Sequence, residues 1–353
     1  MIDFYFKGTN MNENIINYDS LFESMLKCEK GVRWKPSVKC FTINGIEEIA
    51  KMHNRLEKGT WKDGKPKEIK ITYPKKRDGL SISFRDRVYQ RSINDNVLYP
   101  EMVKHFIFDN CACQKGKGTS FARRRVKEHL WNHYCNYKTN GYVLQIDIKG
   151  YYPNMSHDAV KKCFKRYLDS ETFEMIQSVL DNQYSGDVGY NPGSQMVQIA
   201  GISLLNDIDH HIKEKLHIKH YIRYMDDFLL IHDDKNVLEK CLNEIEIKLK
   251  QIGFELNMKK TLIKKLKCGF EFLGFNYKVA KTGKIIMTLK SESVKRERKK
   301  LFRLVNLCKK GKITKEKADE CYKSWKAFAL DGNSYKLLRR MDRYYSDLWR
   351  CES

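Results

Sequence analysis

The sequence lacks several features that mark common classes of protein. Its eleven cysteines form no CxxC pair and no paired Cys/His spacing, and the closest two, Cys111 and Cys113, stand in a CxC arrangement. This spacing argues against a zinc site. No basic segment followed by an apolar core stands at the N-terminus, and no stretch approaches about 20 uninterrupted apolar residues. We therefore expect a cytoplasmic protein with reduced thiols and no membrane partner.

Repeats, low-complexity runs and Pro- or Ser-rich linkers are also missing, and acidic residues are scarce beside basic ones. The chain has 67 Lys and Arg against 44 Asp and Glu, a formal net charge of +23 that is spread along its length. Such a surface indicates a polyanionic partner, most commonly nucleic acid. The alternative is a basic protein whose charge serves solubility alone. With 353 residues and 41% hydrophobic content, the chain can form a core and two or three subdomains.

The first third of the chain is expected to be mainly helical. Residues 1–65 have a polar helical pattern, and a strand follows at EIKITY. From Arg85 to about Phe106 the apolar spacing fits one helix. The stretch CACQKGKGTSFARRR is expected to be a loop. Its glycines between lysines can expose backbone N–H groups to a phosphate, or the loop can simply face solvent.

The middle of the chain alternates apolar strands with helices. A buried strand, GYVLQIDI, contains Asp147 near its end, and a helix is expected after an N-cap at Ser156. Another helix is expected from about Gln195 to Leu216. The apolar flanks of HYIRYMDDFLLIH predict a hairpin with Met225-Asp226-Asp227 at or beside its tip, followed by a helix that Gly253 ends.

The last third is expected to hold strands and then basic helices. CGFEFLGFNYKVAKTGKIIMTL predicts two strands joined by a turn at Lys281-Thr-Gly. From Ser291 onward the pattern is helical and strongly basic, with breaks at Gly311, before Thr314, and at Gly332. These helices predict a separate subdomain.

The two adjacent acids of the hairpin admit two interpretations. An Asp-Asp pair in a turn usually serves turn formation alone. However, Asp147 ends a second apolar strand, and placing that strand beside the hairpin would collect Asp147, Asp226 and Asp227 at one rim of a sheet. Carboxylate oxygens suit Mg²⁺. Two such ions roughly 3.5–4 Å apart support phosphoryl transfer, so the acids predict nucleotide addition.

Four ordered motifs extend this hypothesis: DIKGYYPNM, YMDD inside an apolar hairpin, LNMKKT and FLGF. Together they resemble the reverse transcriptase family over roughly Lys70 to Leu289. SFRDRVYQ and CACQKGKGT further resemble the bacterial enzymes of diversity-generating retroelements and related defence-associated or unclassified groups. The NAxxH and VTG motifs of retron enzymes do not occur. We expect the group II intron enzymes, which carry a maturase or endonuclease extension, to be more distant relatives.

The resemblance implies an α+β right-hand polymerase with fingers, a palm of antiparallel sheet backed by helices, and a helical thumb. The expected domains are an N-terminal helical extension (1–65), fingers and palm (66–289) and a basic thumb (290–353).

By the same resemblance, two metal ions are expected in the palm. Asp147 and Asp226 would be their main ligands, the backbone carbonyl of Ile148 a further one, and Asp227 a weaker partner. The expected ions are Mg²⁺, with Mn²⁺ as the alternative.

Other residues match the family's nucleotide-binding positions. Arg77, and with it Lys75, resembles the fingers cations at the incoming triphosphate; the alternative is a solvated run of cations. Tyr152 stands where the family places an aromatic ring that excludes a ribose 2′-OH, with Tyr151 as the competing choice. Lys260 of LNMKKT matches the lysine that protonates pyrophosphate.

A departure from the family pattern lies before the long palm helix. Many relatives have Gln-Gly-x-x-x-Ser-Pro there, whereas this chain has Pro192 in the Gln position and ends the stretch at Gln198, which is expected beside the nucleotide. A gapped alignment over Gly193-Ser194-Gln195 is the alternative. In the ungapped register Pro192 offers no donor, which predicts error-prone or template-tolerant synthesis.

The function expected from these motifs is RNA-directed DNA synthesis on a dedicated noncoding RNA. The expected partners are that RNA, an RNA–DNA duplex and dNTPs, with a small helical accessory protein or a second copy of the chain. One alternative is a defence-associated enzyme that makes repetitive, untemplated or self-primed DNA against phage. Another is an RNA-binding scaffold without catalysis, which would have no need of the three acids.

Overall fold

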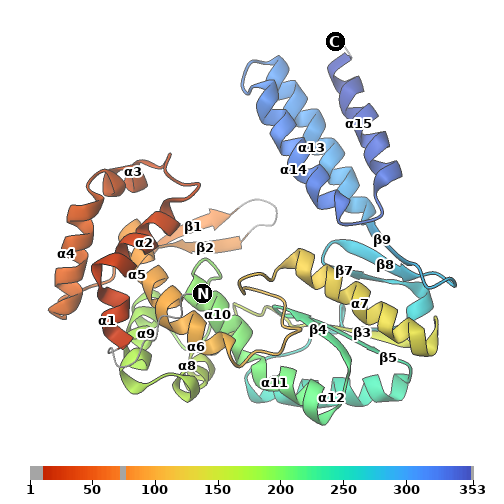
Figure 1. Ribbon diagram of the computed structural model, residues 1–353, viewed down its shortest axis with the longest axis horizontal. Helices are drawn as coiled ribbons and strands as arrows, with labels where there is room; N and C mark the ends of the chain where they lie inside the picture. Colours follow the sequence, from red (N-terminus) through yellow and green to blue (C-terminus); the bar gives the residue numbers. More distant parts are fainter. Residues whose placement is uncertain (1–10, 72–76, 351–353) are drawn as a thin grey trace, which may run out of the picture. The chain divides into compact units, whose positions relative to one another are not determined.

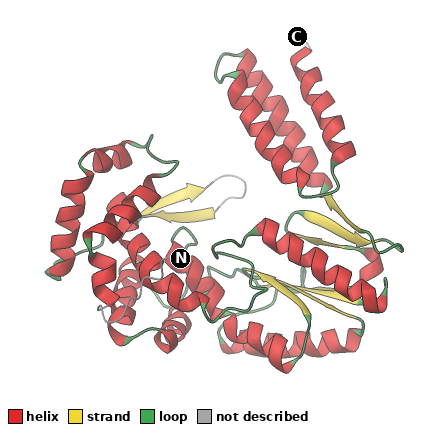
Figure 2. Cartoon of the chain, viewed as in Figure 1, coloured by secondary structure: helices red, strands yellow, loops and turns green. Residues whose placement is uncertain are grey.

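The structure is a computed structural model that describes residues 11–71 and 77–350 (Figures 1 and 2). The chain divides into two compact units. The first comprises residues 1–115, 147–215 and 244–257, and the second comprises residues 116–146, 216–243 and 258–353. Because three separate stretches build each unit, residues far apart in the sequence meet inside it.

Four helices begin the first unit: α1 (Met11–Ile16), α2 (Tyr18–Glu29), α3 (Pro36–Ile43) and α4 (Gly45–Glu57). Asn17 caps α2 because its side chain accepts a hydrogen bond from the Ser20 N–H at 2.8 Å. Leu21 and Met25 of α2 are buried, which gives this helix one apolar face. The helical prediction for this segment is confirmed. The strand predicted at EIKITY is β1 (Lys67–Ile71), which pairs antiparallel with β2 (Arg77–Ser81).

A continuous helical run follows β2. It consists of α5 (Phe84–Ile93), the π-helical segment η1 (Asn94–Leu98) and α6 (Tyr99–Val103). Ser83 caps α5 by accepting the Asp86 N–H at 3.1 Å. The four apolar residues that predicted this helix are all buried: Val88, Ile93, Val97 and Leu98. The prediction is confirmed, with a π-helical stretch in its middle.

The first unit contains further helices, among which α8 packs on α10. They are α8 (His157–Tyr167), α9 (Ser170–Gln183), α10 (Gln195–Leu204), α11 (Asn206–His210) and the π-helical η2 (His211–Lys215), and α12 (Lys235–Gln251) ends in this unit. The N-cap at Ser156 is confirmed. The single helix predicted from Gln195 to Leu216 is wrong, because it breaks at Leu205. Two residues before the break, the Ser203 hydroxyl donates to the Ile199 carbonyl at 2.8 Å, a hydrogen bond of the type that bends helices.

A four-stranded sheet forms the centre of the second unit. It contains β3 (Tyr142–Asp147), β4 (His220–Tyr224), β5 (Asp227–His232) and β6 (Leu262–Lys265), in the order β4-β5-β3-β6. The β4–β5 and β3–β6 pairs are antiparallel. The predicted strand that ends at Asp147 and the predicted hairpin are both confirmed.

Helix α7 (Thr119–Tyr137, yellow in Figure 1) packs on β4 and β5. The loop predicted for CACQKGKGTSFARRR is therefore wrong from Thr119 onward. Ala122, Val126 and Leu130 are fully buried at helical spacing, and burial of this face favours the helix over the loop that the glycines suggested.

A second sheet in this unit has the order β7-β8-β9. Its strands are β7 (Phe270–Phe272), β8 (Phe275–Val279) and β9 (Ile285–Leu289). The predicted turn at Lys281-Thr-Gly is confirmed, but the expectation of two strands is wrong. Leu273 and Gly274, with φ values of 44° and 87°, form a tight turn that divides the first predicted strand into β7 and β8.

Three basic helices end the second unit: α13 (Ser291–Lys309), α14 (Lys315–Leu330) and α15 (Tyr335–Arg350). The predicted breaks at Gly311 and Gly332 are confirmed, and the Thr314 side chain caps α14. Leu301 and Met341 are fully buried and join α13 and α15 to a shared core. In the described parts of the chain, no helix combines the length and apolar character needed to span a bilayer.

Candidate active site

Asp147 is the last residue of β3 and is held by Asn257. The Asn257 side-chain amide donates to Asp147 Oδ2 at 2.8 Å, and the Asn257 backbone N–H donates to the Asp147 carbonyl at 2.8 Å. The carboxylate is half-buried, so solvent reaches it. Two bonds from one residue fix the acid's orientation. Asn257 stands in LNMKKT, a motif that pointed to this region without indicating the contact.

Ile148 follows Asp147 and is buried. It forms an antiparallel bridge with Leu256. The flanking hydrogen bonds run from Lys149 N–H to the Glu255 carbonyl at 2.9 Å and from Asn257 N–H to Asp147. In this pattern the peptide groups of Ile148 itself point away from Leu256. The Ile148 carbonyl is therefore turned away from the Leu256 segment, as a backbone metal ligand requires.

The two adjacent tyrosines have different environments. Tyr151 is only 3% exposed, and its hydroxyl donates to the Gly201 carbonyl of α10. Tyr152 is half-buried, and a Cβ atom built on Gly201 would lie 3.2 Å from its hydroxyl oxygen. Gly201 therefore gives the Tyr152 ring room against α10. Tyr151 therefore belongs to the core, whereas Tyr152 is partly open to solvent.

Gln198 lies on α10 one turn before Gly201. Its side-chain amide donates to the Pro192 carbonyl at 3.0 Å, and its carbonyl oxygen accepts from the Cys113 thiol at 3.7 Å. Gln198 thus holds the loop that carries Pro192. Within the first unit, Tyr152 lies against α10, which carries Gln198, whereas Asp147 and Ile148 lie against the Leu256–Asn257 segment.

The other two predicted acids lie in the β4–β5 hairpin of the second unit. Tyr224 pairs with Asp227, so Met225 and Asp226 are the two turn residues. Met225 has φ 55°, a left-handed conformation that is rare outside glycine. Both acids are half-buried. The prediction that the acids lie at the hairpin tip is confirmed.

Arg223 of β4 supports this turn and was missed by the sequence reasoning. Its side chain is fully buried, and its guanidinium Nη1 donates to the Met225 carbonyl at 2.9 Å. A buried arginine is rare unless its donors are used. The only sequence signal was a cation in an otherwise apolar strand.

The predicted phosphate-binding cations are less defined. Lys260 is exposed in the turn before β6 of the second unit. Arg77 begins β2, and its backbone pairs with Ile71 in the first unit. Lys75 lies outside the described residues.

The donor chemistry of the acids suits a hard cation. Among residues 11–71 and 77–350, no three His, Cys, Asp or Glu side chains gather as a closed metal site. Mg²⁺ does not require such a cage, since it binds through one or two carboxylates and completes its shell with water and substrate phosphates. Each of the Asp147 and Asp226 carboxylates supplies oxygen donors of this kind.

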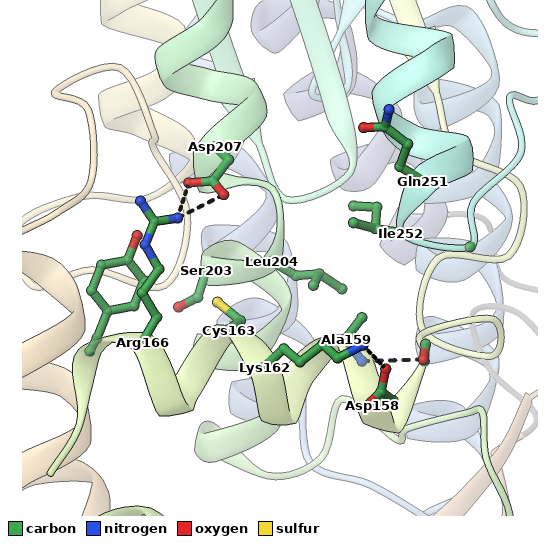
Figure 3. Close-up of a pocket in the computed structure, with 13 residues that line it drawn as sticks. Asp158, Ala159, Lys162, Cys163, Arg166, Ser203, Leu204, Asp207, Gln251 and Ile252 are labelled. Atoms are coloured by element: carbon green, nitrogen blue, oxygen red, sulfur yellow. Dashed lines mark hydrogen bonds and ion pairs between the residues drawn. The ribbon is translucent and has the colours of Figure 1, made fainter.

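A cavity of about 440 Å³ lies elsewhere in the first unit, between α8, the α10–α11 junction and the end of α12 (Figure 3). Asp207 accepts two hydrogen bonds of 2.9 Å from Arg166, and this carboxylate raises the pKa of the arginine. Burial raises the pKa of the Cys163 thiol to about 12, so it is no nucleophile. None of the predicted site residues lines this cavity.

Comparison with known proteins gives a family and a fold. Residues 74–277, more than half of the chain, match the family described as reverse transcriptase (RNA-dependent DNA polymerase). No curated protein sequence matches the chain. The structure is similar to telomerase from Candida albicans in complex with a TWJ fragment of telomeric RNA, with a TM-score of 0.50, 15% identity, and coverage of 81% of this chain and 55% of that one.

Two further structures are apo telomerase from Candida tropicalis. The form truncated from its C-terminal domain gives a TM-score of 0.47 at 15% identity and covers 64% of this chain and 54% of that one. The other gives 0.48 at 13% identity, with 64% and 48% covered. The chain thus spans about half the length of these structures. The family match and the Candida albicans likeness confirm the expected α+β right-hand fold.

Proposed function

Because the chain belongs to the reverse transcriptase (RNA-dependent DNA polymerase) family, we propose that it synthesises DNA on an RNA template by two-metal nucleotidyl transfer. One observation carries this proposal. In the four-stranded sheet β5 is the direct neighbour of β3. Asp147 ends β3, Asp226 is the turn residue just before β5, and Asp227 begins β5. A binding module has no use for such acids on neighbouring strands.

Asp147, Asp226 and the Ile148 carbonyl are the proposed ligands of two Mg²⁺ ions, for which Mn²⁺ can substitute. Asp227 pairs with Tyr224 in the ladder and is assigned a weaker role. When bound, the ions would activate the primer 3′-hydroxyl and stabilise the leaving pyrophosphate. Asn257 orients the Asp147 carboxylate, and Arg223 holds the turn that presents Asp226.

The other proposed roles concern the incoming nucleotide. Arg77 and Lys75 bind its triphosphate, and Lys260 supplies a proton to the pyrophosphate. The Tyr152 ring excludes a 2′-hydroxyl, which its position against Gly201 supports. Gln198 acts indirectly, by holding the loop that contains Pro192, since its side-chain amide donates a hydrogen bond to the Pro192 carbonyl.

The proposed template is a dedicated noncoding RNA, and the proposed product complex is an RNA–DNA duplex. The exposed cations of α13 and α15 support this, because they can follow duplex phosphates. RNA binding by the Candida albicans telomerase, whose structure contains telomeric RNA, also supports an RNA partner. A small helical accessory protein or a second copy of the chain is proposed to complete the assembly.

Sequencing the DNA that the purified protein makes with its co-purifying RNA tests the proposal. We expect DNA complementary to that RNA. Repetitive, untemplated or self-primed DNA would instead favour the defence-associated activity. If the protein binds RNA but makes no DNA with Mg²⁺ or Mn²⁺, the proposal fails and the chain is an RNA-binding scaffold.

A further inference from the structure

Helix α7 presents two stacked aromatic rings on its exposed side. The rings of Trp131 and Tyr134 are nearly parallel, with centroids 5.9 Å apart and an interplanar angle of 22°. Trp131 remains 51% exposed despite this contact, so its other ring face is open to solvent. We call Trp131, Tyr134, Lys138, Lys281 and Lys284 the α7 aromatic surface.

Tyr134 is locked beneath the tryptophan. Its hydroxyl donates to the Lys281 carbonyl at 2.8 Å, and the Lys138 Nζ lies 5.2 Å from its ring centroid. Gly283 has φ 82°, and a Cβ atom there would lie 2.5 Å from the tyrosine ring. The glycine therefore allows the β8–β9 turn to seat the ring. Because the lower ring cannot swing away, the pair is a preformed stacking platform.

The surroundings of this platform are cationic. Lys138, Lys281 and Lys284 are exposed, and the segment from Asn276 to Lys290 contains no acid. The acid of α7, Glu128, pairs with Arg124 at 3.6 Å and with Arg125. Glu128 therefore does not neutralise these three lysines, and the electrostatic potential at the platform is positive.

We propose that the α7 aromatic surface binds single-stranded RNA, with a base stacked on Trp131 and backbone phosphates beside Lys138, Lys281 and Lys284. Open aromatic faces flanked by cations are what sequence-tolerant single-strand binding requires. A protein partner fits less well, because charged residues are depleted from the centres of protein interfaces.

The exposed Trp131 ring lies off the face of α7 that packs on β4 and β5. Ala122, Val126 and Leu130 are buried, and the same helix packs on β4 and β5. The binding site is therefore separate from the strands that carry the acids. It holds a part of the RNA other than the nucleotides that meet Asp226, and it requires no catalysis.

The test uses the full chain saturated with a short blunt RNA–DNA hybrid, so that a duplex site is filled. Binding of a labelled uridine oligonucleotide is then followed by fluorescence anisotropy. Trp131→Ala should weaken binding by about fivefold or more, since base stacking on an aromatic ring contributes about 1–3 kcal/mol. Trp131→Phe should restore most of the affinity, because a ring remains.

Trp34→Ala is the matched control. Trp34 is 77% exposed and has the Lys35 Nζ 5.6 Å from its ring, but among residues 11–71 and 77–350 no second ring is stacked on it. This variant should bind RNA like wild type. Lys281→Gln combined with Lys284→Gln should flatten the salt dependence of binding, by about 0.7 in log–log slope for each phosphate that the lysines neutralise in the wild type.

Equal RNA affinity in Trp131→Ala and wild type would overturn the proposal, as would an equal loss in Trp34→Ala. So would an unchanged affinity accompanied by a changed oligomeric state, which would make the surface a protein interface. Primer extension on a short primed template should stay at the wild-type rate in Trp131→Ala. Failure of this site is thereby distinguished from failure of the polymerase activity.

Discussion

Two tight turns in the second unit each join antiparallel strands through two residues, but their sequences differ. Met225 and Asp226 join β4 to β5, and Leu273 and Gly274 join β7 to β8. In the first turn Met225 is left-handed at φ 55°, and in the second both residues are left-handed. Glycine adopts this conformation without cost, whereas a methionine does so only when its surroundings impose it.

A buried arginine side chain donates a hydrogen bond to a backbone carbonyl of each turn. Arg223 is 0% exposed and donates to the Met225 carbonyl at 2.9 Å. Arg123 is 5% exposed and donates to the Leu273 carbonyl at 3.3 Å. Arg123 also pairs with Asp331, and its guanidinium carbon lies 4.8 Å from the ring centroids of both Phe275 and Phe328.

Each turn begins with a left-handed residue that is not glycine, Met225 in one turn and Leu273 in the other, so the turns differ at the second position. The β7–β8 turn has Gly274 at that position, in the left-handed region, while the β4–β5 turn has Asp226. Backbone strain of about 1–3 kcal/mol persists where function requires it. The comparison teaches that glycine relaxes the second position of the β7–β8 turn, whereas the β4–β5 turn gives that position to an acid.

The largest expected effect comes from removing the acid of the strained turn. Asp226→Asn should abolish primer extension, because a proposed metal ligand is removed, while the melting temperature stays close to wild type. The acid is half-buried at a turn, so its replacement does not open the core. Primer extension and thermal melting measure the two properties.

Asp233→Asn is the matched control for this change. Asp233 lies just beyond β5 and pairs with His232 at 3.4 Å. It should extend primers like wild type. If Asp226→Asn keeps more than trace activity, or if Asp233→Asn loses as much, the assignment of Asp226 is wrong.

The next largest effect is expected from replacing Arg223, which donates a hydrogen bond to the β4–β5 turn. Arg223→Met removes the hydrogen bond to Met225, and a turn displaced by about 1 Å should lower kcat about a hundredfold. The KM for dNTP should change much less, because the substituted residue is not proposed to bind the nucleotide. Steady-state kinetics at a temperature where both proteins are folded make the comparison.

Arg123→Met is the matching change at the other turn. It should lower the free energy of unfolding by about 1–3 kcal/mol, since the side chain loses an ion pair and a hydrogen bond. Its kcat should change much less than that of Arg223→Met, because none of the proposed metal ligands lies in the β7–β8 turn. Equal decreases of kcat in both variants would mean that Arg223 and Arg123 do not differ in their effect on catalysis.

The smallest expected effects are changes of opposite sign in the free energy of unfolding when the residues of the two turns are replaced. Met225→Gly should raise the free energy of unfolding by up to about 1 kcal/mol, because relief of strain exceeds the entropy cost of glycine. Gly274→Ala should lower it by about 1–2 kcal/mol: its φ is 87°, and the new Cβ would lie 3.2 Å from Phe328. Chemical denaturation measures both, and shifts of the same sign would refute the comparison.

The sequence predicted these elements unevenly, for physical reasons. Helices with a cap and an apolar stripe, such as the one after Ser156, and the hairpin around Asp226 follow from local patterns. The β7–β8 turn was missed, because aromatic residues continue on both sides of Leu273-Gly274. A local pattern carries no information on the bond from Arg123 to Leu273, which are 150 positions apart.

The candidate site was predicted to a similar extent. The motifs identified Asp147 and Asp226 by residue type and order. They did not reveal that Asn257 orients Asp147 across 110 positions, or that Arg223 supports the turn. Supporting interactions of this kind depend on packing between distant segments, which a single sequence does not display.

Primer extension on a heteropolymeric RNA template tests the central claim most directly. The wild-type protein, a DNA primer annealed to that RNA, four dNTPs and Mg²⁺ are incubated, and the product is sequenced. The account predicts DNA complementary to the RNA, formed only with a divalent cation and absent with Asp226→Asn. No extension with either Mg²⁺ or Mn²⁺, or a product sequence independent of the template, would contradict it.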